Sequence, residues 1–294
     1  VLLIQVGGMG VVTMAVAIFM FSGRKIGLKQ RWVMQESISA PQVGGIVRMT
    51  GFILKTAFLI EAIGALLLAL RFCPQFGLGK GIWYGIFHAV SAFCNAGFDL
   101  MGETGAFSSL TGYVGDPLVN LVICLLIVVG GLGFLTWHDV AAHGRHVSQY
   151  RLQSKLILLT TLALLVGGFL FFRFYEFSRP QWAALTGGER GLAALFQSVS
   201  PRTAGFNTVD LTQLSACSQL MTILLMLAGG SPGSTAGGFK TTTLAVLLLS
   251  VGAVIRRQGS ARCFGRRLPD QVLRNACAIF LLYLVLFLAG GMLI

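Results

Sequence analysis

Two stretches of sequence decide the fold: SAFCNAGFDL at residues 91–100 and SPRTAGFNTVDL at residues 200–211. The first begins inside an apolar segment at residues 82–96, and the second begins inside one at residues 191–204. Neither segment can cross a membrane, because a helix of about 12 residues is only about 18 Å long and the hydrocarbon core is about 30 Å thick. We therefore predict two re-entrant half-helices, each ending in a turn of small residues.

Longer apolar runs flank the half-helices and have the length of membrane-spanning helices. They cover residues 1–21, 52–70, 117–138, 156–174, 219–255 (interrupted) and 275–294. Three of them carry similar glycine-rich motifs: QVGGMGVVT (5–13), VVGGLGFLT (128–136) and LAGGSPGST (227–235). The sequence thus repeats a unit of helix, pore half-helix, turn and helix, as many transport proteins do.

This repeat divides the chain into four parts. Residues 1–23 are the end of repeat one, 50–140 are repeat two, 154–256 are repeat three, and 270–294 are the first helix of repeat four. Both ends of the chain lie inside apolar runs, so we expect it to be a piece of a longer protein.

The composition indicates that most of the chain is solvated by lipid. Of the 294 residues, 55% are hydrophobic and 11% are charged, whereas an average soluble protein has about 25% charged residues. We predict an all-α membrane protein with the repeated units arranged around a central ion pore. Paired catalytic groups are not evident in the sequence, and an enzyme is not expected.

The basic residues cluster in three loops, at residues 22–50, 139–155 and 256–274. These loops contain fourteen of the 22 Lys and Arg residues and only three of the 10 Asp and Glu residues. The positive-inside rule places them in the cytoplasm. Contact of a solvated basic patch with anionic lipid is an alternative explanation and gives the same orientation. Membrane topology thus accounts for the net charge of +12 without nucleic acid.

The turns Asn95-Ala96-Gly97-Phe98 and Thr203-Ala204-Gly205-Phe206 have the residue types of a cation-binding backbone. Irregular backbone at membrane depth is tolerated where it is buried in protein or lines a water-filled cavity. Glycine takes positive φ at little cost, which allows consecutive carbonyls to point the same way and replace the hydration shell of a cation. The C-terminal end of each half-helix adds partial negative charge.

These motifs resemble the Trk/Ktr/HKT superfamily of potassium uptake proteins, and most closely its bacterial Ktr-like membrane subunits. SAFCNAGFDL is similar to that family's second filter segment, SVSPRTAGFNTVDL to its third, and GGSPGSTAGGFKTTT to the broken helix of its third repeat. The resemblance extends along the whole chain, which corresponds to about two thirds of a full-length member. Filters one and four would lie outside this chain.

The resemblance implies both a site and a function. Gly97 and Gly205 match the filter glycines, and Asn95, Ala96, Thr203 and Ala204 complete the filter backbone, whose carbonyls would bind potassium. Cys94 and Pro201 depart from the residues common in the family. Members take up potassium across the plasma membrane, the inner membrane in bacteria. They form homodimers and bind a cytosolic nucleotide-sensing regulatory subunit, and no cofactor is expected in this chain.

A polar loop interrupts the apolar run at residues 219–255. It consists of Gly229, Gly230, Ser231, Pro232, Gly233, Ser234, Thr235, Ala236, Gly237 and Gly238. Its backbone groups need partners other than a helix, which again indicates a cavity, and the family resemblance implies that it is the gate below the filter. A phosphate-binding loop is excluded, because Phe239 separates the last glycine from Lys240. Lys240 either sets an electrostatic barrier in the pore or extends to the membrane interface.

Two ionisable residues inside apolar segments leave alternatives open. Glu61 is either a functional intramembrane acid or a structural partner of a polar group on another helix. His88 either packs in the protein or carries protons. A sodium- or proton-coupled carrier is the alternative function, although it would need several intramembrane carboxylates and Glu61 is the one clear example. The six scattered cysteines indicate neither zinc nor disulfides.

Overall fold

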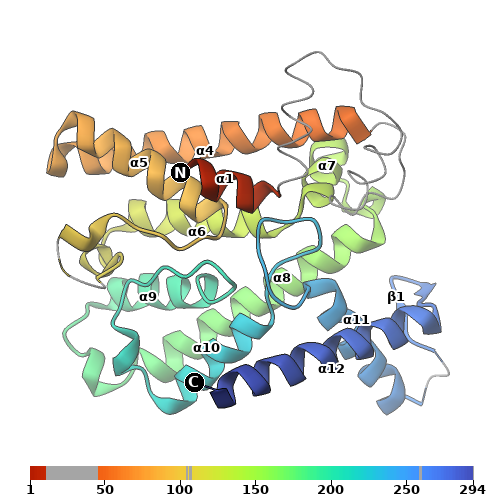
Figure 1. Ribbon diagram of the computed structural model, residues 1–294. Coiled ribbons are helices and arrows are strands. Elements are labelled where there is room, and N and C mark those ends of the chain that lie inside the picture. The colour runs from red at the N-terminus through yellow and green to blue at the C-terminus, as the bar shows by residue number, and fades with distance from the viewer. Residues whose placement is uncertain (11–45, 104, 106–107, 258–259, 294) are drawn as a thin grey trace.

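The computed structural model describes residues 1–10, 46–103, 105, 108–257 and 260–293. Its helices are α1 (Leu2–Met9), α4 (Ile46–Phe76), α5 (Leu78–Phe93), α6 (Pro117–Gly131), α7 (Phe134–His143), α8 (Leu152–Phe171), α9 (Gly187–Val199), α10 (Ala216–Leu227), α11 (Thr241–Ile255) and α12 (Asp270–Leu293), as labelled in Figure 1. Short 3₁₀ turns and a π-helical turn, η4 (Phe172–Glu176), join them. The predicted all-α fold is confirmed, and the basic loop at 22–50 lies largely outside the described residues.

Membrane-spanning length is reached by three of the described helices. They cover Val47–Phe76, Leu152–Glu176 and Asp270–Leu293. The bent pair α6 and α7 makes a fourth candidate, with an angle of 98° between its two halves. The sequence predicted one continuous span at 117–138, but Gly133 has φ of 87° and breaks the helix there. The polar interruption at 229–238 divides the apolar run at 219–255 into α10 and α11.

The half-helices α5 and α9 are present, but both begin and end earlier than the sequence predicted. Gly77, at φ of 84°, reverses the chain after α4, so α5 already begins at Leu78. Thr186 and Glu189 form a capping box that starts α9 at Gly187, because each side chain accepts a hydrogen bond from the other residue's backbone. That Thr-x-x-Glu motif was visible in the sequence and was not used.

Repeats two and three have the same order of elements. Helix α5 packs against α4 and α6, and α9 packs against α8 and α10; α6 also contacts α9 and so joins the two groups. Figure 1 shows α4, α5 and α6 in one half of the molecule and α8 to α12 in the other. The large buried core contains residues of both groups, among them Phe72, Phe93 and Phe196.

The basic segment 256–274 contains a small hairpin that the sequence analysis missed. Strands β1 (Arg262–Cys263) and β2 (Arg266–Arg267) pair antiparallel. Phe264 and Gly265 connect them, both at positive φ; this conformation costs little at Gly265, because glycine has no Cβ, and is less favourable at Phe264. After the hairpin, α12 leaves the bundle, with 6% of its most apolar window buried.

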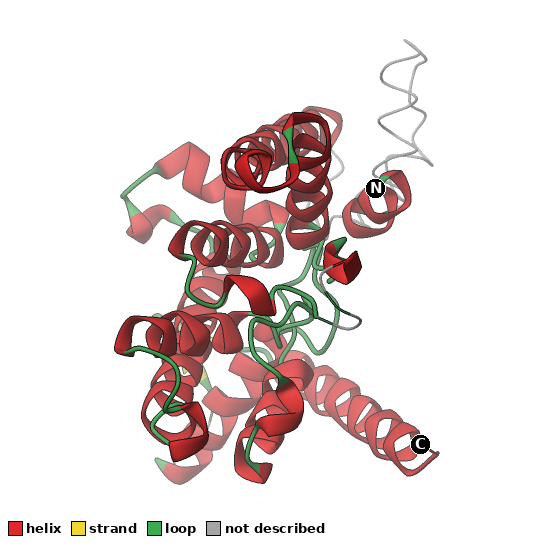
Figure 2. Cartoon of the chain, turned by 90° about the vertical axis from the view of Figure 1, so that its left-hand side faces the viewer, coloured by secondary structure: helices red, strands yellow, loops and turns green. Residues whose placement is uncertain are grey.

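Figure 2 shows a group of non-helical segments in the middle of the molecule, between the helices. The two small-residue turns and the interrupting loop hydrogen-bond to each other there, as described below. This arrangement places irregular backbone away from lipid, as a membrane fold requires.

Candidate functional site

The backbones of the two turns follow the same unusual pattern. In the repeat-two turn (residues 95–98), φ is 50° at Asn95 and 72° at Gly97. In the repeat-three turn (residues 203–206), φ is 71° at Thr203 and 88° at Gly205. The positive values at the glycines are as anticipated, but those at Asn95 and Thr203 were not. A non-glycine residue in this region costs roughly 1–2 kcal/mol, so the surroundings must hold it.

A serine closes each turn from the half-helix. The hydroxyl of Ser91 donates to the carbonyl of Phe98 at 2.7 Å, and the hydroxyl of Ser200 donates to the carbonyl of Phe206. The carbonyl of each serine also accepts a backbone N–H from its turn. Sequence reasoning missed both serines, although the repeated Val-Ser pairs before the two turns were a signal for them.

The two turns lie directly against each other. A Cβ added to Gly97 would be 2.3 Å from the carbonyl oxygen of Ala204 and 2.9 Å from the Cα of Gly205. Segments more than 100 residues apart in sequence are therefore in backbone contact, and Gly97 permits the contact because it lacks a side chain.

Cavities flank the pair of turns on both sides. One of about 390 Å³ lies between the repeat-two turn and α1, and it is lined by Leu3, Ile4, Gly7, Gly8, Cys94, Ala96, Phe98 and Thr235. Another of about 470 Å³ lies beside the repeat-three turn, where Thr203, Ala204 and Gly205 contribute to its lining. Ala96 lines both cavities, so the turns separate two hollows.

The interrupting loop (residues 229–238) is docked on the bend between α6 and α7. The N–H of Ser231 donates to the carbonyl of Gly131 at 3.0 Å, and that of Thr235 donates to Gly130 at 3.2 Å. In return, the N–H of Phe134 donates to the carbonyl of Gly233 at 2.7 Å. The two helix breaks thus satisfy each other's backbone groups, which lipid could not do.

The same loop contacts both turns. The hydroxyl of Thr235 accepts a hydrogen bond from the Nδ2 of Asn95 at 3.2 Å and donates to the carbonyl of Phe93 at 2.8 Å. Two residues later, the N–H of Gly237 donates to the hydroxyl of Thr203 at 3.1 Å. Asn95 and Thr203 are the two non-glycine residues at positive φ in the turns. The loop therefore contacts each turn at its strained residue.

Two basic side chains lie beside the loop. Arg202, which the sequence analysis did not single out, is buried, and its Nη2 donates to the carbonyl of Gly229 at 3.3 Å. Its Nε has no partner in the described part of the chain. Lys240 is the N-cap residue of α11, but its side chain makes no capping hydrogen bond. Its Nζ instead donates to the carbonyl of Ala236 at 2.9 Å. The ammonium group therefore lies on the loop itself.

Glu61 joins three elements at the base of the repeat-two turn. Its Oε2 accepts from the Nε2 of Gln5 on α1 at 3.0 Å, and the thiol of Cys94 lies 3.7 Å from the Oε1 of Gln5. A Cβ on Gly8 would be 2.5 Å from that of Cys94, so α1 and the end of α5 are in close contact. Glu61 thus has the structural partner on another helix that was one of its two interpretations.

His88 packs behind the repeat-two turn with both ring nitrogens bonded. Its Nε2 accepts the N–H of Leu100 at 3.3 Å, which leaves Nδ1 to donate to the carbonyl of Tyr84 at 2.7 Å. The side chain is fully buried. This geometry favours the packing interpretation over proton transfer, because a neutral ring already satisfies both contacts.

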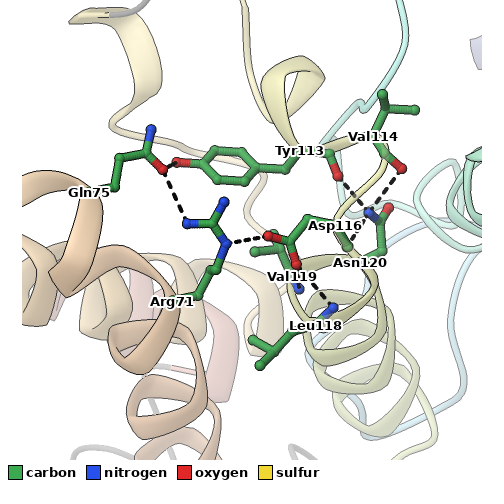
Figure 3. A network of polar contacts seen from close by, with 8 residues as sticks. All are labelled: Arg71, Gln75, Tyr113, Val114, Asp116, Leu118, Val119 and Asn120. Carbon is green, nitrogen blue, oxygen red and sulfur yellow. Dashed lines mark hydrogen bonds and ion pairs between the residues drawn. The ribbon is translucent and has the colours of Figure 1, made fainter.

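In repeat two, the start of α6 is fixed by an acid at its N-terminus (Figure 3). Asp116 accepts from the N–H groups of Leu118 and Val119, each at 3.1 Å, and so caps α6; it also pairs with Arg71 from the end of α4. Asn120 donates to the carbonyl of Tyr113 at 2.7 Å and closes the loop before the cap.

In repeat three, the start of α10 is stabilised by a buried acid from η4, the helical turn that follows α8. Glu176, at the end of η4, is fully buried. Its carboxylate accepts from the Nε1 of Trp182 at 2.9 Å and from the hydroxyls of Ser215 and Ser218, both at 2.6 Å. Ser215 is the N-cap of α10, so the acid stabilises the start of that helix through its capping residue.

These features define a class: a multi-pass helical membrane protein in which half-helices lead into small-residue turns at the centre of the bundle. The chain belongs to the TrkH family of cation transport proteins, whose sequence profile matches residues 1–294. This is a family of ion transporters rather than enzymes.

Individual relatives agree with this placement. The chain is 39% identical over 284 residues to the potassium/sodium uptake protein NtpJ of Enterococcus hirae, covering 97% of this chain and 62% of that protein. It is 39% identical over 289 residues to the Ktr system potassium uptake protein B of Bacillus subtilis, covering 98% of this chain and 64% of that protein. The chain thus spans less than two thirds of the length of either relative.

A solved structure shares the fold. The crystal structure of the potassium transporter TrkH from Vibrio parahaemolyticus superimposes with a TM-score of 0.70 at 20% sequence identity, covering 98% of this chain and 56% of that chain. The likeness shows that the two chains share their overall fold.

Proposed function

We propose that this chain is part of a pore-forming subunit for potassium uptake across the plasma membrane, with the turns at 95–98 and 203–206 as two walls of its selectivity filter. The observation that carries the proposal is the matched alternation of positive φ in the two turns, together with their backbone contact. Alternating backbone of this kind presents carbonyl oxygens, which replace the hydration shell of a cation.

The surroundings of the turns support a cation rather than an anion as the transported ion. The half-helices α5 and α9 direct their C-terminal ends, with their partial negative charge, at the turns. The names of the relatives specify potassium, or potassium and sodium. Potassium is then the substrate, held by the backbone of Asn95, Ala96, Gly97, Thr203, Ala204 and Gly205.

The loop at 229–238 is in this proposal the gate. It lies against both turns, and its glycines and proline cannot continue the helix that flanks it. A segment with two arrangements is what a regulator needs in order to control conduction.

The proposed partners are a second copy of the subunit and a cytosolic nucleotide-binding protein, in line with the naming of one relative as protein B of a Ktr system.

Uptake into a bacterial strain that lacks its own potassium transporters tests the function. Expression of the full-length protein should restore growth at low potassium and produce rubidium uptake, whereas the double substitution Gly97→Ser and Gly205→Ser should not. Equal folded amounts with equal uptake in both proteins would contradict the assignment of the turns.

Flux measurements in vesicles separate the proposed pore from the alternative, a sodium- or proton-coupled carrier. A pore carries potassium when the membrane potential is the sole driving force. A coupled carrier would need a sodium or pH gradient as well. A strict requirement for either gradient would contradict the pore and favour the coupled carrier.

A further inference from the structure

We propose that the interrupting loop is also a structural part of the filter: Thr235 and Gly237 hold Asn95 and Thr203 at positive φ, so Thr235 is a positioning residue for ion selectivity. The proposal rests on the function proposed above and adds to the gate a second role. Its basis is that the loop meets each turn at the residue whose backbone is least favourable.

The strain at Asn95 and Thr203 requires an external restraint. Both have a Cβ, and for such residues positive φ is disfavoured, mildly for Asn95, since asparagine tolerates the left-handed region, and most strongly for a β-branched side chain such as that of Thr203. Such conformations persist where the surrounding structure holds them in place. The side-chain hydrogen bonds described for both residues run to the loop in each case.

Thr235 links the side chain of Asn95 to the end of the half-helix. The Thr235 hydroxyl has one hydrogen, which it donates to the carbonyl of Phe93, so its oxygen accepts from the Asn95 amide. Hydrogen bonds in a chain of this kind strengthen one another. The chain fixes the position of the Asn95 side chain relative to α5, and with it the backbone rotation at Asn95.

Gly237 holds the other turn through its backbone. Its N–H donates to Thr203, and a Cβ on the next residue, Gly238, would lie 3.3 Å from the Thr203 methyl group. Arg202, the neighbour of Thr203, reaches the first residue of the loop, Gly229. The repeat-three turn is therefore attached to both ends of the loop.

A consequence concerns the open state. If the loop moves away to admit ions, the Asn95 and Thr203 contacts break together, and both turns lose their restraint at the same time. Ion selectivity should then depend on the position of the loop, which makes the gate and the filter a coupled unit.

Substitution of Thr235 in the full-length protein tests the proposal. Thr235→Val keeps the shape and removes both hydrogen bonds, whereas Thr235→Ser keeps the hydroxyl. We expect Thr235→Val to raise the potassium concentration for half-maximal uptake by about fivefold, the factor that corresponds to the one net hydrogen bond that Asn95 loses. The ratio of potassium to sodium uptake should fall, and Thr235→Ser should stay close to the wild type.

Thr161→Val is the matched control. Thr161 is also buried, on α8, and its hydroxyl has no partner among the residues that the structure describes. The same change of side chain there should leave the potassium dependence and the ion ratio unaltered. Thr203→Val provides a second test, because it removes the acceptor of Gly237 without a change in the loop sequence, and it should shift both quantities as Thr235→Val does.

The outcomes distinguish this proposal from the function on which it rests. A wild-type protein that takes up no potassium would overturn the proposed function. A wild-type protein that does so, with Thr235→Val and Thr203→Val equal to it in half-maximal concentration and ion ratio, would overturn the positioning role alone. A shift produced equally by Thr161→Val would also overturn it, since the effect would then follow from any buried threonine.

Discussion

Repeats two and three use the same elements but differ at the helix that follows the turn. In repeat two, α6 and α7 meet at a sharp bend of 98° around Gly133. In repeat three, α10 and α11 are separated by the whole interrupting loop. The short break forms a platform and the long one lies on it, through the hydrogen bonds to Gly130 and Gly131. One repeat thus supplies the platform, and the other supplies the loop that we propose as the gate.

The turns differ as well. Six positions separate Ser91 from Gly97, whereas five separate Ser200 from Gly205, so the segment between the serine and the turn is one residue longer in repeat two. The shared features are the positive φ at the first and third residues and the serine bond to the phenylalanine carbonyl. The backbone conformation of the turn is therefore retained although its first residue and its distance from the serine differ.

Substitution of the two glycines should produce the largest effect and an asymmetry between the repeats. Gly97→Ser and Gly205→Ser both place a side chain at positive φ, at roughly 1–2 kcal/mol. A Cβ at Gly97 would also be 2.3 Å from Ala204, whereas the nearest atom to a Cβ at Gly205 is 3.3 Å away. We expect both variants to lose potassium selectivity, and Gly97→Ser to lose about tenfold more.

Competition between potassium and sodium uptake, normalised to the amount of protein in the membrane, measures this difference. A fixed amount of folded protein is the control. Equal selectivity in the two variants would show that the contact between the turns has no role, and unchanged selectivity in both would contradict the filter.

The second prediction compares the two helix breaks. Gly229→Ala with Gly230→Ala should displace the loop, because the added Cβ atoms would be 2.2 Å from the carbonyl oxygen of Gly237 and from the Cβ of Ala236. We expect a higher maximal uptake rate and weaker control by the regulatory partner. Gly130→Ala, whose Cβ would be 2.0 Å from the carbonyl oxygen of Phe93, should instead reduce the amount of folded protein.

Initial rates of rubidium uptake, with and without the regulatory partner, report on the gate. Uptake that falls in proportion to folded protein in the loop variant would make the loop a structural kink. A faster rate in Gly130→Ala would contradict the division into a platform and a gate.

The third prediction compares the acids that stabilise the starts of α6 and α10. Asp116→Asn keeps an N-cap and removes an ion pair with an Arg71 side chain that is 40% exposed, so it should cost at most about 1 kcal/mol. Glu176→Gln leaves buried donors with one acceptor fewer, and should cost about 3 kcal/mol. Thermal unfolding in detergent measures both. Equal unfolding midpoints for the two variants would contradict the expectation that the buried acid contributes more to stability than the partly exposed ion pair.

Sequence reasoning identified the all-α membrane fold and led to the candidate site, because both predictions rest on local patterns. Apolar length indicated the long helices, although it did not reveal the bend at Gly133, and the repeated Gly-Phe pair indicated the turns. The positive φ of Asn95 and Thr203 was not predictable, because it depends on contacts with Thr235 and Gly237 more than 30 residues away in sequence. Arg202 was missed for a similar reason, since its Nη2 donates to a carbonyl of the loop, that of Gly229, which is distant in sequence.

Element ends were also missed where a local signal competed with hydropathy. The apolar window placed the start of the second half-helix at residue 191, yet Thr186 and Glu189 start it earlier. The hydrogen bonds of Glu176 to Ser215 and Ser218 could not be predicted, because the sequence does not show that η4 and the start of α10 are adjacent.

The smallest expected effect, and the last test, concerns the loops that follow the two repeats. The predicted topology puts residues 139–155 and 256–274 on the same, cytoplasmic side. In a protein without its native cysteines, single cysteines at the exposed positions Arg145 and Arg262 should react with an impermeant maleimide in inside-out vesicles and not in intact cells. Reaction at either position from outside would reverse the orientation, and reaction from opposite sides would contradict the equivalence of the repeats.

The native Cys263 sharpens this measurement at its neighbouring position. Burial raises the pKa of the Cys263 thiol, and its side chain packs near Leu156 and Ala245. The thiolate is the reactive form, so at neutral pH less of Cys263 is reactive than of an exposed cysteine. We expect Arg262→Cys, with Cys263 replaced by serine, to be modified quickly, and the protein with Cys263 alone to react slowly, with a rate that rises toward higher pH. Equal rates at the two positions would mean that the hairpin does not pack against α8 and α11, and that the segment after repeat three is a free basic loop.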